Sequence, residues 1–236
     1  GMIGIPIFPP RGKATDARIQ TIADDARASI VLTTERIHTN MASRLDHAPH
    51  LKQLDWLATD RIADEVAASW REPAIDGDTL AFLQYTSGST GIPKGVMVSH
   101  GNLLHNSAYT ADLWQYDSES TMVTWLPIFH DMGLIFGILQ PLYKGFPCYL
   151  MSPAAFVQHP FRWLQAISHY RATHSGAPNF AYDLCVQKIS AAQRETLDLS
   201  SWQMSLNAAE PVRADTFQQF CEAFKTCGLQ PTTVCQ

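Results

Sequence analysis

The chain contains 236 residues, of which 46% are hydrophobic and 17% are charged, and its formal net charge is −5. This composition is typical of an ordinary globular protein and excludes a disordered chain. The basic residues are scattered and form no basic block, so the sequence predicts no nucleic-acid partner. The longest nearly uninterrupted apolar run, residues 133–139, is far shorter than the roughly 20 residues of a spanning helix, so we expect no membrane span.

The cysteines point to a reducing compartment. They are odd in number, contain no CxxC pair and have no histidine at metal-ligand spacing, which predicts reduced, structural thiols. No secretory signal opens the chain, so a cytoplasmic location is expected. Apolar runs stand at both ends, and we therefore expect a piece of a longer polypeptide. The five cysteines are Cys148, Cys185, Cys221, Cys227 and Cys235.

In the first half of the chain, short β-rich runs alternate with helical patterns. Ile19, Ile22 and Ala23 fall at helical spacing, and a β-rich run follows them. Ser99 stands just before a helical pattern that begins at His100, where a serine is suited to cap the helix. The expected strands are 3–10, 28–34, 54–59, 79–86 and 95–99, and the expected helices are 16–27, 63–70 and one from His100 onward.

The second half continues the same alternation, which predicts βα units and an α/β fold with mostly parallel sheet flanked by helices. The number of strands predicts two sheets rather than one. The expected strands are 121–127, 147–152, 173–177, 203–207 and a run from 232 to the end, and the expected helices are 134–143, 161–171, 179–189 and 213–226.

Between two strand-like runs lies a loop, residues 86–95, whose composition suits a polyphosphate. Its glycines leave backbone N–H groups uncovered, its hydroxyls add donors, and Lys94 adds a mobile positive charge. The loop does not match the Walker sequence, because Pro93, Lys94 and Gly95 stand where that pattern needs other residues. The alternative interpretation is a flexible, solvated Ser/Gly loop.

Three segments resemble the adenylate-forming superfamily, which includes acyl-CoA synthetases, nonribosomal peptide adenylation domains and luciferases. The segment YTSGSTGIPKGVMVSHGNL is similar to its phosphate loop. The strings HDMGL and RATHSGAPNFAYDLC resemble the fatty acyl-AMP ligase branch, as does LSSWQMSLNAAEPVRADT. The resemblance covers essentially the whole chain and implies part of the large N-terminal domain, residues 1–236, with two packed βα subdomains.

The resemblance implies roles for individual residues. It places His130 near the substrate carboxylate and the α-phosphate of ATP, in a positioning and charge-stabilising role supported by Asp131. The residues themselves also allow a structural role, in which Asp131 caps a helix and His130 packs beside it. The β- and γ-phosphates, with Mg²⁺ sharing their charge, are expected to contact Thr86, Ser87, Gly88, Ser89, Thr90, Gly91 and Lys94.

Two further segments are expected around the nucleotide and the acyl chain. By resemblance, a turn lies along the adenine, and it contains Asn207, Ala208, Ala209 and Glu210. Its usual string is NGAEP, and the methyl group of Ala208 in place of glycine is expected to cost on the order of 1 kcal/mol if backbone approaches the ring or takes a positive φ. A wall of the acyl and nucleotide cleft is expected from Ser175, Gly176, Ala177, Pro178 and Asn179, although apolar residues here equally suit a core.

The function implied by the resemblance is ATP-dependent activation of a fatty acid to acyl-AMP, followed by transfer to the thiol of an acyl carrier protein in a polyketide or nonribosomal peptide system. A CoA ligase is the alternative within the same class. A nucleotide or acyl binding module without turnover is the alternative from a different class. The family's later motifs, including its Mg²⁺-binding glutamate and the lysine of its C-terminal domain, are absent from the 236 residues, so we expect these residues alone to be inactive and to lack a complete metal site.

Overall fold

The structure is a computed structural model and describes residues 2–10, 12–86, 93–230 and 234–235. Its residues divide into two compact units, Gly1–Leu103 and Leu104–Gln236. The expected packing of two subdomains against each other stays a prediction. No helix in the described part of the chain is long and apolar enough to cross a membrane.

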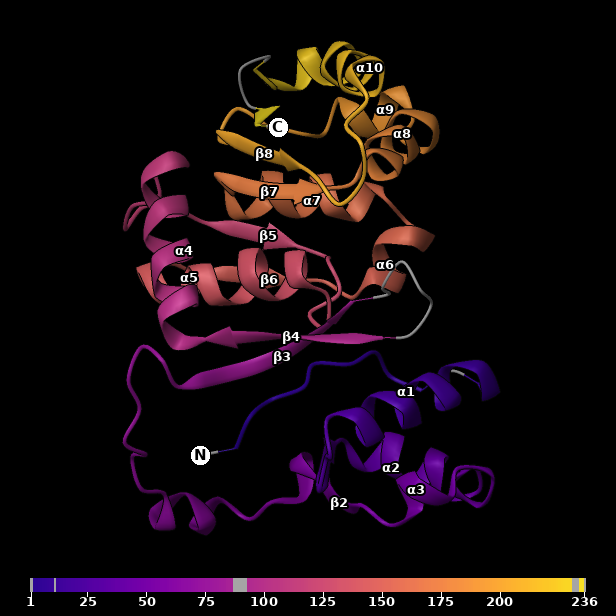
Figure 1. The fold of residues 1–236 in the computed structure, drawn as a ribbon. Helices are drawn as coiled ribbons and strands as arrows, with labels where there is room; N and C mark the ends of the chain where they lie inside the picture. The colour runs from indigo at the N-terminus through magenta and orange to yellow at the C-terminus, as the bar shows by residue number, and fades with distance from the viewer. Residues whose placement is uncertain (1, 11, 87–92, 231–233, 236) are drawn as a thin grey trace. The chain divides into compact units, whose positions relative to one another are not determined.

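The first unit contains two small sheets (Figure 1). The strands β1 and β2 are parallel, and the apolar face predicted for α1 is confirmed, because Ile19 packs with Ala48 and Leu51 in a small core. The expected helix 63–70 is instead a 3-10 helix with no buried residue, so no packing favours an α-helix there. The elements are α1 (Lys13–Asp25), β1 (Ile30–Thr33), α2 (Glu35–Ala42), α3 (Pro49–Lys52), β2 (Asp55–Ala58), β3 (Leu80–Thr86) and β4 (Lys94–Ser99), with 3-10 helices at Leu45–His47, Thr59–Arg61 and Asp64–Ser69.

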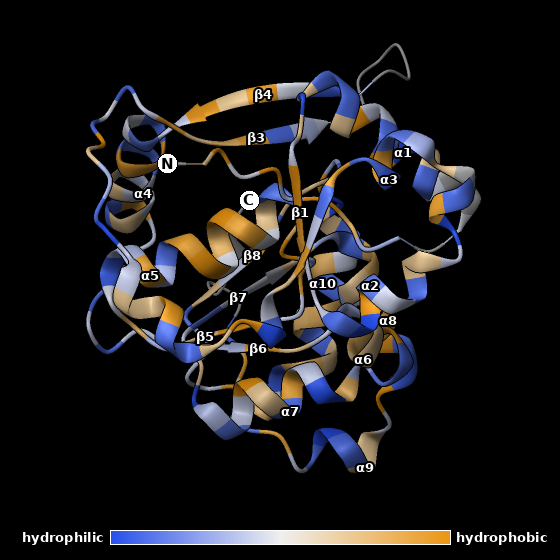
Figure 2. Cartoon of the chain, turned by 90° about the horizontal axis from the view of Figure 1, so that it is seen from below, coloured by the Kyte–Doolittle hydropathy of each residue, from blue (hydrophilic) through white to orange (hydrophobic). Residues whose placement is uncertain are grey.

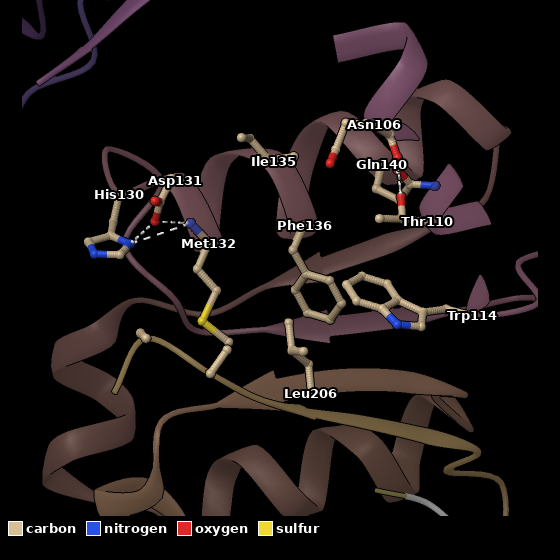
Figure 3. Close-up of a pocket in the computed structure, with 12 residues that line it drawn as sticks. Asn106, Thr110, Trp114, His130, Asp131, Met132, Ile135, Phe136, Gln140 and Leu206 are labelled. Atoms are coloured by element: carbon tan, nitrogen blue, oxygen red, sulfur yellow. Dashed lines mark hydrogen bonds and ion pairs between the residues drawn. The ribbon is translucent and has the colours of Figure 1, made fainter. Parts of the chain in front are cut away.

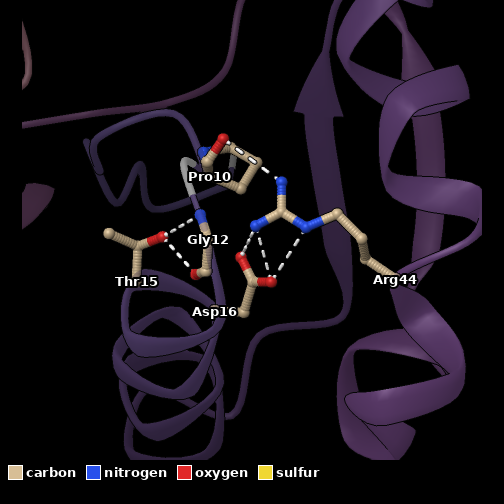
Figure 4. Close-up of polar contacts among 5 residues, drawn as sticks. All are labelled: Pro10, Gly12, Thr15, Asp16 and Arg44. Carbon is tan, nitrogen blue, oxygen red and sulfur yellow. Dashed lines mark hydrogen bonds and ion pairs between the residues drawn. The ribbon is translucent and has the colours of Figure 1, made fainter.

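A buried ion pair joins α1 to the residues that follow α2 (Figure 4). Arg44 donates from Nη2 to Asp16 Oδ1 at 2.5 Å and from Nε to Asp16 Oδ2 at 3.0 Å, and Asp16 is largely buried. The hydroxyl of Thr15 accepts from Gly12 N–H at 2.9 Å and so satisfies a donor at the start of the helix. These contacts fix the start of α1 against the chain after α2.

The strands β3 and β4 form an antiparallel hairpin, in contrast to the parallel pairing expected for most of the chain. Figure 2 shows that β4 is mostly apolar, and Met97 on it is 65% exposed. A Cβ on Gly95 would lie 2.9 Å from the ring of Tyr85, so a larger residue at position 95 would displace that ring. The strand expected at 3–10 is wrong: only a bridge between Gly4 and Phe82 forms, because the prolines of this run cannot donate to a ladder.

The second unit is built on a five-stranded parallel sheet of order β6-β5-β7-β8-β9. Together with the first unit this makes three sheets in the described residues rather than the two expected, because the β3–β4 hairpin and the β1–β2 pair remain separate. Figure 1 shows β5, β7 and β8 side by side, and α8 packs against α10. The elements are α4 (His100–Leu113), which begins in the first unit, β5 (Met122–Thr124), α5 (Gln140–Lys144), β6 (Cys148–Leu150), α6 (Pro153–Gln158), α7 (Phe161–Tyr170), β7 (His174–Ala177), α8 (Asn179–Lys188), α9 (Ala191–Arg194), β8 (Met204–Asn207), α10 (Ala214–Phe224), a 3-10 helix (Lys225–Cys227) and β9 (Val234–Cys235).

The core of this unit is aromatic. Trp163 of α7, Tyr182 of α8 and Phe220 of α10 are fully buried, and the Trp163 and Tyr182 rings meet edge to face at 5.5 Å. Ser99 caps α4 as predicted: its Oγ accepts from Asn102 N–H, while Asn102 Oδ1 accepts from Ser99 N–H. The helices expected in this half are confirmed in position, with one change of type.

That change is the helix expected at 134–143, which is a π-helix over Met132–Leu139 followed by α5. Pro141 has no N–H to donate back along the helix, which interrupts a regular α-helical ladder at this point. The helix also lies very close to the chain before it, because a Cβ on Gly133 would meet the carbonyl oxygen of Pro127 at 2.1 Å. Wide π turns recur at functional sites, and this one borders a pocket of the unit.

The cysteines whose side chains the structure describes are free thiols, as predicted. Burial raises the pKa of Cys148 to about 12 and also raises the pKa of Cys185, so both stay protonated at neutral pH. The side chain of Cys235 lies outside the described part.

Candidate active site

A pocket of about 520 Å³ opens in the second unit beside the C-terminal ends of β5 and β8 (Figure 3). Its volume falls in the range of small-molecule sites, about 300–1,000 Å³. The C-terminal edge of a parallel sheet is the usual position of such sites. The residues that line it are Asn106, Thr110, Trp114, His130, Asp131, Met132, Ile135, Phe136, Gln140, Leu206, Ala208 and Ala209.

His130 and Asp131 form one end of the pocket. His130 Nδ1 lies 2.6 Å from Asp131 Oδ1, and the same carboxylate oxygen accepts from Met132 N–H at 2.6 Å at the start of the π-helix. Both side chains are about half exposed. The capping role that the sequence left open for Asp131 is therefore present together with the histidine contact. Figure 3 shows the other ring nitrogen of His130 turned away from Asp131, where it is available to a substrate oxygen.

The π-helix and the strand β8 form the apolar walls of the pocket. Ile135 and Phe136 come from the π-helix, and Leu206 comes from the middle of β8. Phe136 meets Trp114 edge to face, with ring centroids 5.6 Å apart. These apolar walls suit a hydrocarbon ligand.

A polar group stands at the other end of the pocket. Gln140 is 1% exposed, and its Nε2 donates to the carbonyl oxygen of Ser107 at 3.1 Å. Its Oε1 accepts from Thr110 Oγ1 at 3.0 Å. Because both functions of the buried amide are satisfied within the protein, this end is fixed in place.

The turn that follows β8 is held by Asn179. Its Oδ1 accepts from Asn207 Nδ2 at 2.9 Å and from Arg213 N–H at 3.0 Å, while its Nδ2 donates to the carbonyl oxygen of Pro211 at 2.9 Å. Asn179 is completely buried. One fully satisfied amide thus closes the loop that carries residues 208–210.

Within this turn, the backbone strain is at Ala209 and not at Ala208. Ala209 has a φ of +74°, and it is one of few non-glycine residues in the described part with a positive φ. Ala208 has no positive φ, is partly buried and packs against the main core. The conformational cost expected at Ala208 is therefore wrong as far as φ is concerned, although a close approach of its methyl group to a ligand stays a prediction.

The residues expected to form a cleft wall lie in and after β7. Ser175, Gly176 and Ala177 are fully buried strand residues, and Ser175 Oγ donates to the carbonyl oxygen of Val123 at 2.6 Å. None of residues 175–179 is among those that line the pocket. Residues 175–177 are part of the sheet itself, and contact of residues 175–179 with a ligand stays a prediction.

Two of the expected phosphate-binding residues belong to the first unit. Thr86 and Lys94 are register partners at the end of the β3–β4 hairpin next to its connecting residues, and both are exposed. The Lys94 backbone belongs to the ladder of the hairpin. Ser87, Gly88, Ser89, Thr90 and Gly91 lie outside the described residues. Glu210 is exposed, beyond the pocket.

Sequence reasoning missed the α4 side of the pocket. Asn106, Thr110 and Trp114 contribute to the lining, and their spacing of four residues places them on one face of a helix. That spacing was readable in the sequence, but the face is polar and aromatic rather than apolar, so it carried no signal for a core or a site. In the part of the chain that the structure describes, no cluster of three or more His, Cys, Asp or Glu side chains could hold a metal ion.

Comparison with known proteins settles the family. The model of the family described as AMP-binding enzyme matches residues 1–233. The chain belongs to this family. An AMP-binding enzyme with a parallel sheet and flanking helices agrees with the predicted α/β fold, and the predicted resemblance to fatty acyl-AMP ligases is confirmed by its relatives.

Two curated relatives illustrate what the chain is similar to. The medium-chain-fatty-acid–[acyl-carrier-protein] ligase JamA of Moorena producens (strain JHB) is 47% identical over 98% of the chain and 40% of its own length. The putative fatty-acid–CoA ligase FadD21 of Mycobacterium tuberculosis (strain H37Rv) is 36% identical over 95% of the chain and 40% of its own length.

Among solved structures, the fatty acyl-adenylate ligase from L. pneumophila, in complex with acyl adenylate and pyrophosphate, matches with a TM-score of 0.88 and 41% identity. That match covers 98% of the chain and 40% of the solved one. The AMP-binding chain thus spans about two fifths of the length of the relatives it matches.

Proposed function

We propose that the protein containing this chain activates a fatty acid with ATP to form acyl-AMP and pyrophosphate. The observation that carries the proposal is the pocket, which has the paired His130 and Asp131 at one end and apolar walls behind them. A fatty acid has the matching shape, with one charged end and an apolar tail. The names of the relatives, fatty-acid ligases and an acyl-adenylate ligase, support the same substrate class.

In the proposed step, a carboxylate oxygen attacks the α-phosphorus, the new C(O)–O–P bond forms, and the bond to the β-phosphate breaks to release pyrophosphate. Asp131 holds His130 by Nδ1, which leaves the other ring nitrogen to orient the carboxylate and the α-phosphate oxygens. Orientation of two anions in line is the larger part of such catalysis. The turn at Ala208 and Ala209 lines the same pocket, and in this proposal it borders the nucleotide.

The described residues fit ATP in part. Lys94 and Thr86 present a charge and a hydroxyl on the two sides of the connection between β3 and β4, which suits the leaving phosphates. For Mg²⁺, the described residues offer no carboxylate cluster, so we assign it no ligand in this chain and derive no step from it.

The acyl acceptor in the proposed reaction is the thiol of an acyl carrier protein. The thiol sulfur attacks the acyl carbonyl, a C–S bond forms, the C–O bond to the phosphate breaks, and AMP leaves while the thiol proton passes to solvent. The name of JamA supports this acceptor, whereas the name of FadD21 favours CoA as a second candidate. The unpaired thiols of the described cysteines agree with a reducing compartment, and we place the reaction in the cytoplasm.

We also propose that residues 1–236 by themselves do not turn over. Removal of one transition-state contact costs about 10²- to 10³-fold in rate, and several of the family's later motifs are missing from these residues together. Binding of nucleotide or fatty acid without turnover is the expected remaining activity. Isothermal titration of residues 1–236 with AMP and with octanoate, beside an assay for acyl-AMP, tests this directly.

The test of the main proposal uses the natural polypeptide that contains these residues. Fatty-acid-dependent release of pyrophosphate from ATP is expected, and mass spectrometry should detect acyl-AMP. Amino-acid-dependent release in its place would refute the lipid substrate. Addition of CoA or of a phosphopantetheinylated carrier protein to the acyl-AMP complex then separates the two acceptors.

A further inference from the structure

The depth of the pocket can be measured against the sheet. Ala208 and Ala209 border the pocket just after the C-terminal end of β8. Trp114 lies at the level of the opposite end of the strands, because its carbonyl oxygen is 3.1 Å from Nε2 of His174, and His174 pairs in register with Met204, the first residue of β8. The four steps along the chain from Met204 to Ala208 span about 13 Å at 3.3 Å per residue.

The helical wall gives a similar length. The side chains of the π-helix pass from Met132, beside His130, to Gln140, and eight residues span at most about 12 Å at the rise of an α-helix. Figure 3 shows the same order, with His130 and Asp131 at one side, Ile135 and Phe136 between, and Gln140, Thr110 and Trp114 at the other. The pocket therefore has a carboxylate-binding end and a closed end.

The closed end is anchored to the sheet by His174. This histidine is 1% exposed, and since a carbonyl only accepts, its Nε2 carries the proton that bonds Trp114. Its Nδ1 contacts Thr173 Oγ1 at 2.8 Å, and its ring lies 4.3 Å from that of Tyr116. Burial lowers the pKa of His174, which keeps the ring neutral and this pattern of bonds intact.

Trp114 itself is held on two further sides. Its indole meets the rings of Phe136 and Tyr116 edge to face, at 5.6 Å and 6.1 Å. Beside it, the amide of Gln140 is fixed by its bonds to Ser107 and Thr110. The terminal methyl group of an acyl chain that reaches this end would meet the Trp114 ring and the Gln140 amide. That amide is already hydrogen-bonded within the protein.

We propose that Trp114, anchored by His174 and flanked by Gln140, is the residue that limits the length of the acyl chain. The inference rests on the proposed function and adds its specificity determinant. An extended chain of carbon–carbon bonds of about 1.5 Å advances about 1.3 Å per carbon, so about 12 Å holds roughly nine or ten carbons. The substrate class is thus a medium-chain fatty acid, and longer acids must displace the tryptophan.

The test is a chain-length series in the natural polypeptide that contains this chain. Hexanoic, octanoic, decanoic, dodecanoic, tetradecanoic and hexadecanoic acid are compared by kcat/KM for pyrophosphate release. For the unaltered protein, each added methylene that is buried is expected to raise kcat/KM by about fourfold until the pocket is full, and kcat/KM then falls. Trp114→Ala is expected to raise the ratio for tetradecanoic over octanoic acid by at least about tenfold.

Three variants separate this role from a general loss of structure. Ile135→Phe fills the middle of the same pocket and is expected to move the optimum to shorter acids. His174→Phe keeps a buried ring but loses the bond to Trp114, so the cut-off is expected to broaden while kcat for octanoic acid is retained. Trp70→Ala removes a tryptophan that is 71% exposed in the other unit and is expected to leave the series unchanged.

The outcomes distinguish the two proposals. If the unaltered protein, Trp114→Ala and Ile135→Phe all turn over fatty acids with the same dependence of kcat/KM on chain length, the limit at Trp114 is overturned. The proposed function then still stands. No fatty-acid-dependent turnover in the unaltered protein would overturn the proposed function itself. If Trp114→Ala does not fold, a shift to shorter acids in Ile135→Phe supports the inference, and the absence of that shift overturns it.

Discussion

Asn179→Ala should release the turn that carries Ala208 and Ala209. The asparagine side chain makes three hydrogen bonds, to Asn207, Pro211 and the backbone N–H of Arg213. It is also completely buried, so water cannot replace these bonds without opening the structure. The variant therefore tests whether one side chain fixes the nucleotide-side end of the pocket.

The magnitude follows from the bond count and from what is left behind. Three hydrogen bonds of about 1 kcal/mol each amount to about 3 kcal/mol. The amide of Asn207 already has one buried oxygen with no hydrogen-bond partner, and the substitution would leave its Nδ2 unpaired as well. A newly unsatisfied buried group adds about 1–3 kcal/mol, so the expected loss is about 4–6 kcal/mol.

Amide hydrogen exchange is the suitable assay, because it reports local opening. A loss of about 4 kcal/mol corresponds to about 10³-fold faster exchange in the peptide that covers residues 207–213, since each 1.4 kcal/mol is a factor of ten. Exchange in α7 should change much less. Asn106→Ala, which removes an exposed amide from the pocket, is the matched control and should leave the turn unchanged. If the amide exchange rate of residues 207–213 rises by less than about threefold in Asn179→Ala relative to the unaltered protein, the reasoning is refuted.

Two further predictions concern charge. Lys94→Ala should slow adenylation by about 10²- to 10³-fold, measured by pyrophosphate release. Because the side chain is exposed, the free energy of unfolding should change by less than about 0.5 kcal/mol, measured by urea unfolding. A large loss of stability would mark the lysine as structural. Burial lowers the pKa of His174 below its usual 6.5, against smaller opposing effects of the bond to Trp114 and the charge of Asp117. The unfolded state then binds more protons than the folded state. The contribution of His174 to the free energy of unfolding is therefore present above about pH 6.5 and is lost as the pH falls, by up to about 1.4 kcal/mol per pH unit. Urea unfolding from pH 7.5 to 5 should show this slope of the free energy of unfolding against pH. In His174→Phe the slope should be smaller by the amount that one proton contributes.

Much of the fold was predictable because its elements carry local signals. The cap of α4 rests on Ser99 and Asn102, which are neighbours in sequence, and the apolar face of α1 repeats at helical spacing. The site strings were also local, since Ala208 follows β8 directly and His130 lies in the turn between β5 and the π-helix. Residues just after parallel strands meet at one edge of the sheet, and the two do line one pocket.

The rest depends on contacts that the sequence does not encode locally. The π-helix arises where Pro141 interrupts the ladder and Gly133 allows close contact with Pro127, and neither effect is visible in hydrophobic periodicity. The closed end of the pocket joins α4 to β7 through His174 and Trp114, which are 60 residues apart. A buried histidine in a strand reads as an ordinary core residue until its partner is known.

The turn after β8 shows how a family pattern and a structure can disagree about which residue is strained. The usual string places glycine at position 208, yet the positive φ belongs to Ala209, where the pattern already has alanine. A left-handed conformation costs a non-glycine residue about 1–2 kcal/mol, whereas glycine at an unstrained position loses about 0.4–1 kcal/mol through the unfolded state. Ala209→Gly is therefore expected to be more stable than Ala208→Gly by about 1–2 kcal/mol, measured by urea unfolding of the two variants side by side. A more stable Ala208→Gly would show instead that the methyl group at 208 is the strained one, and that the glycine of the pattern serves the backbone rather than room for the ligand.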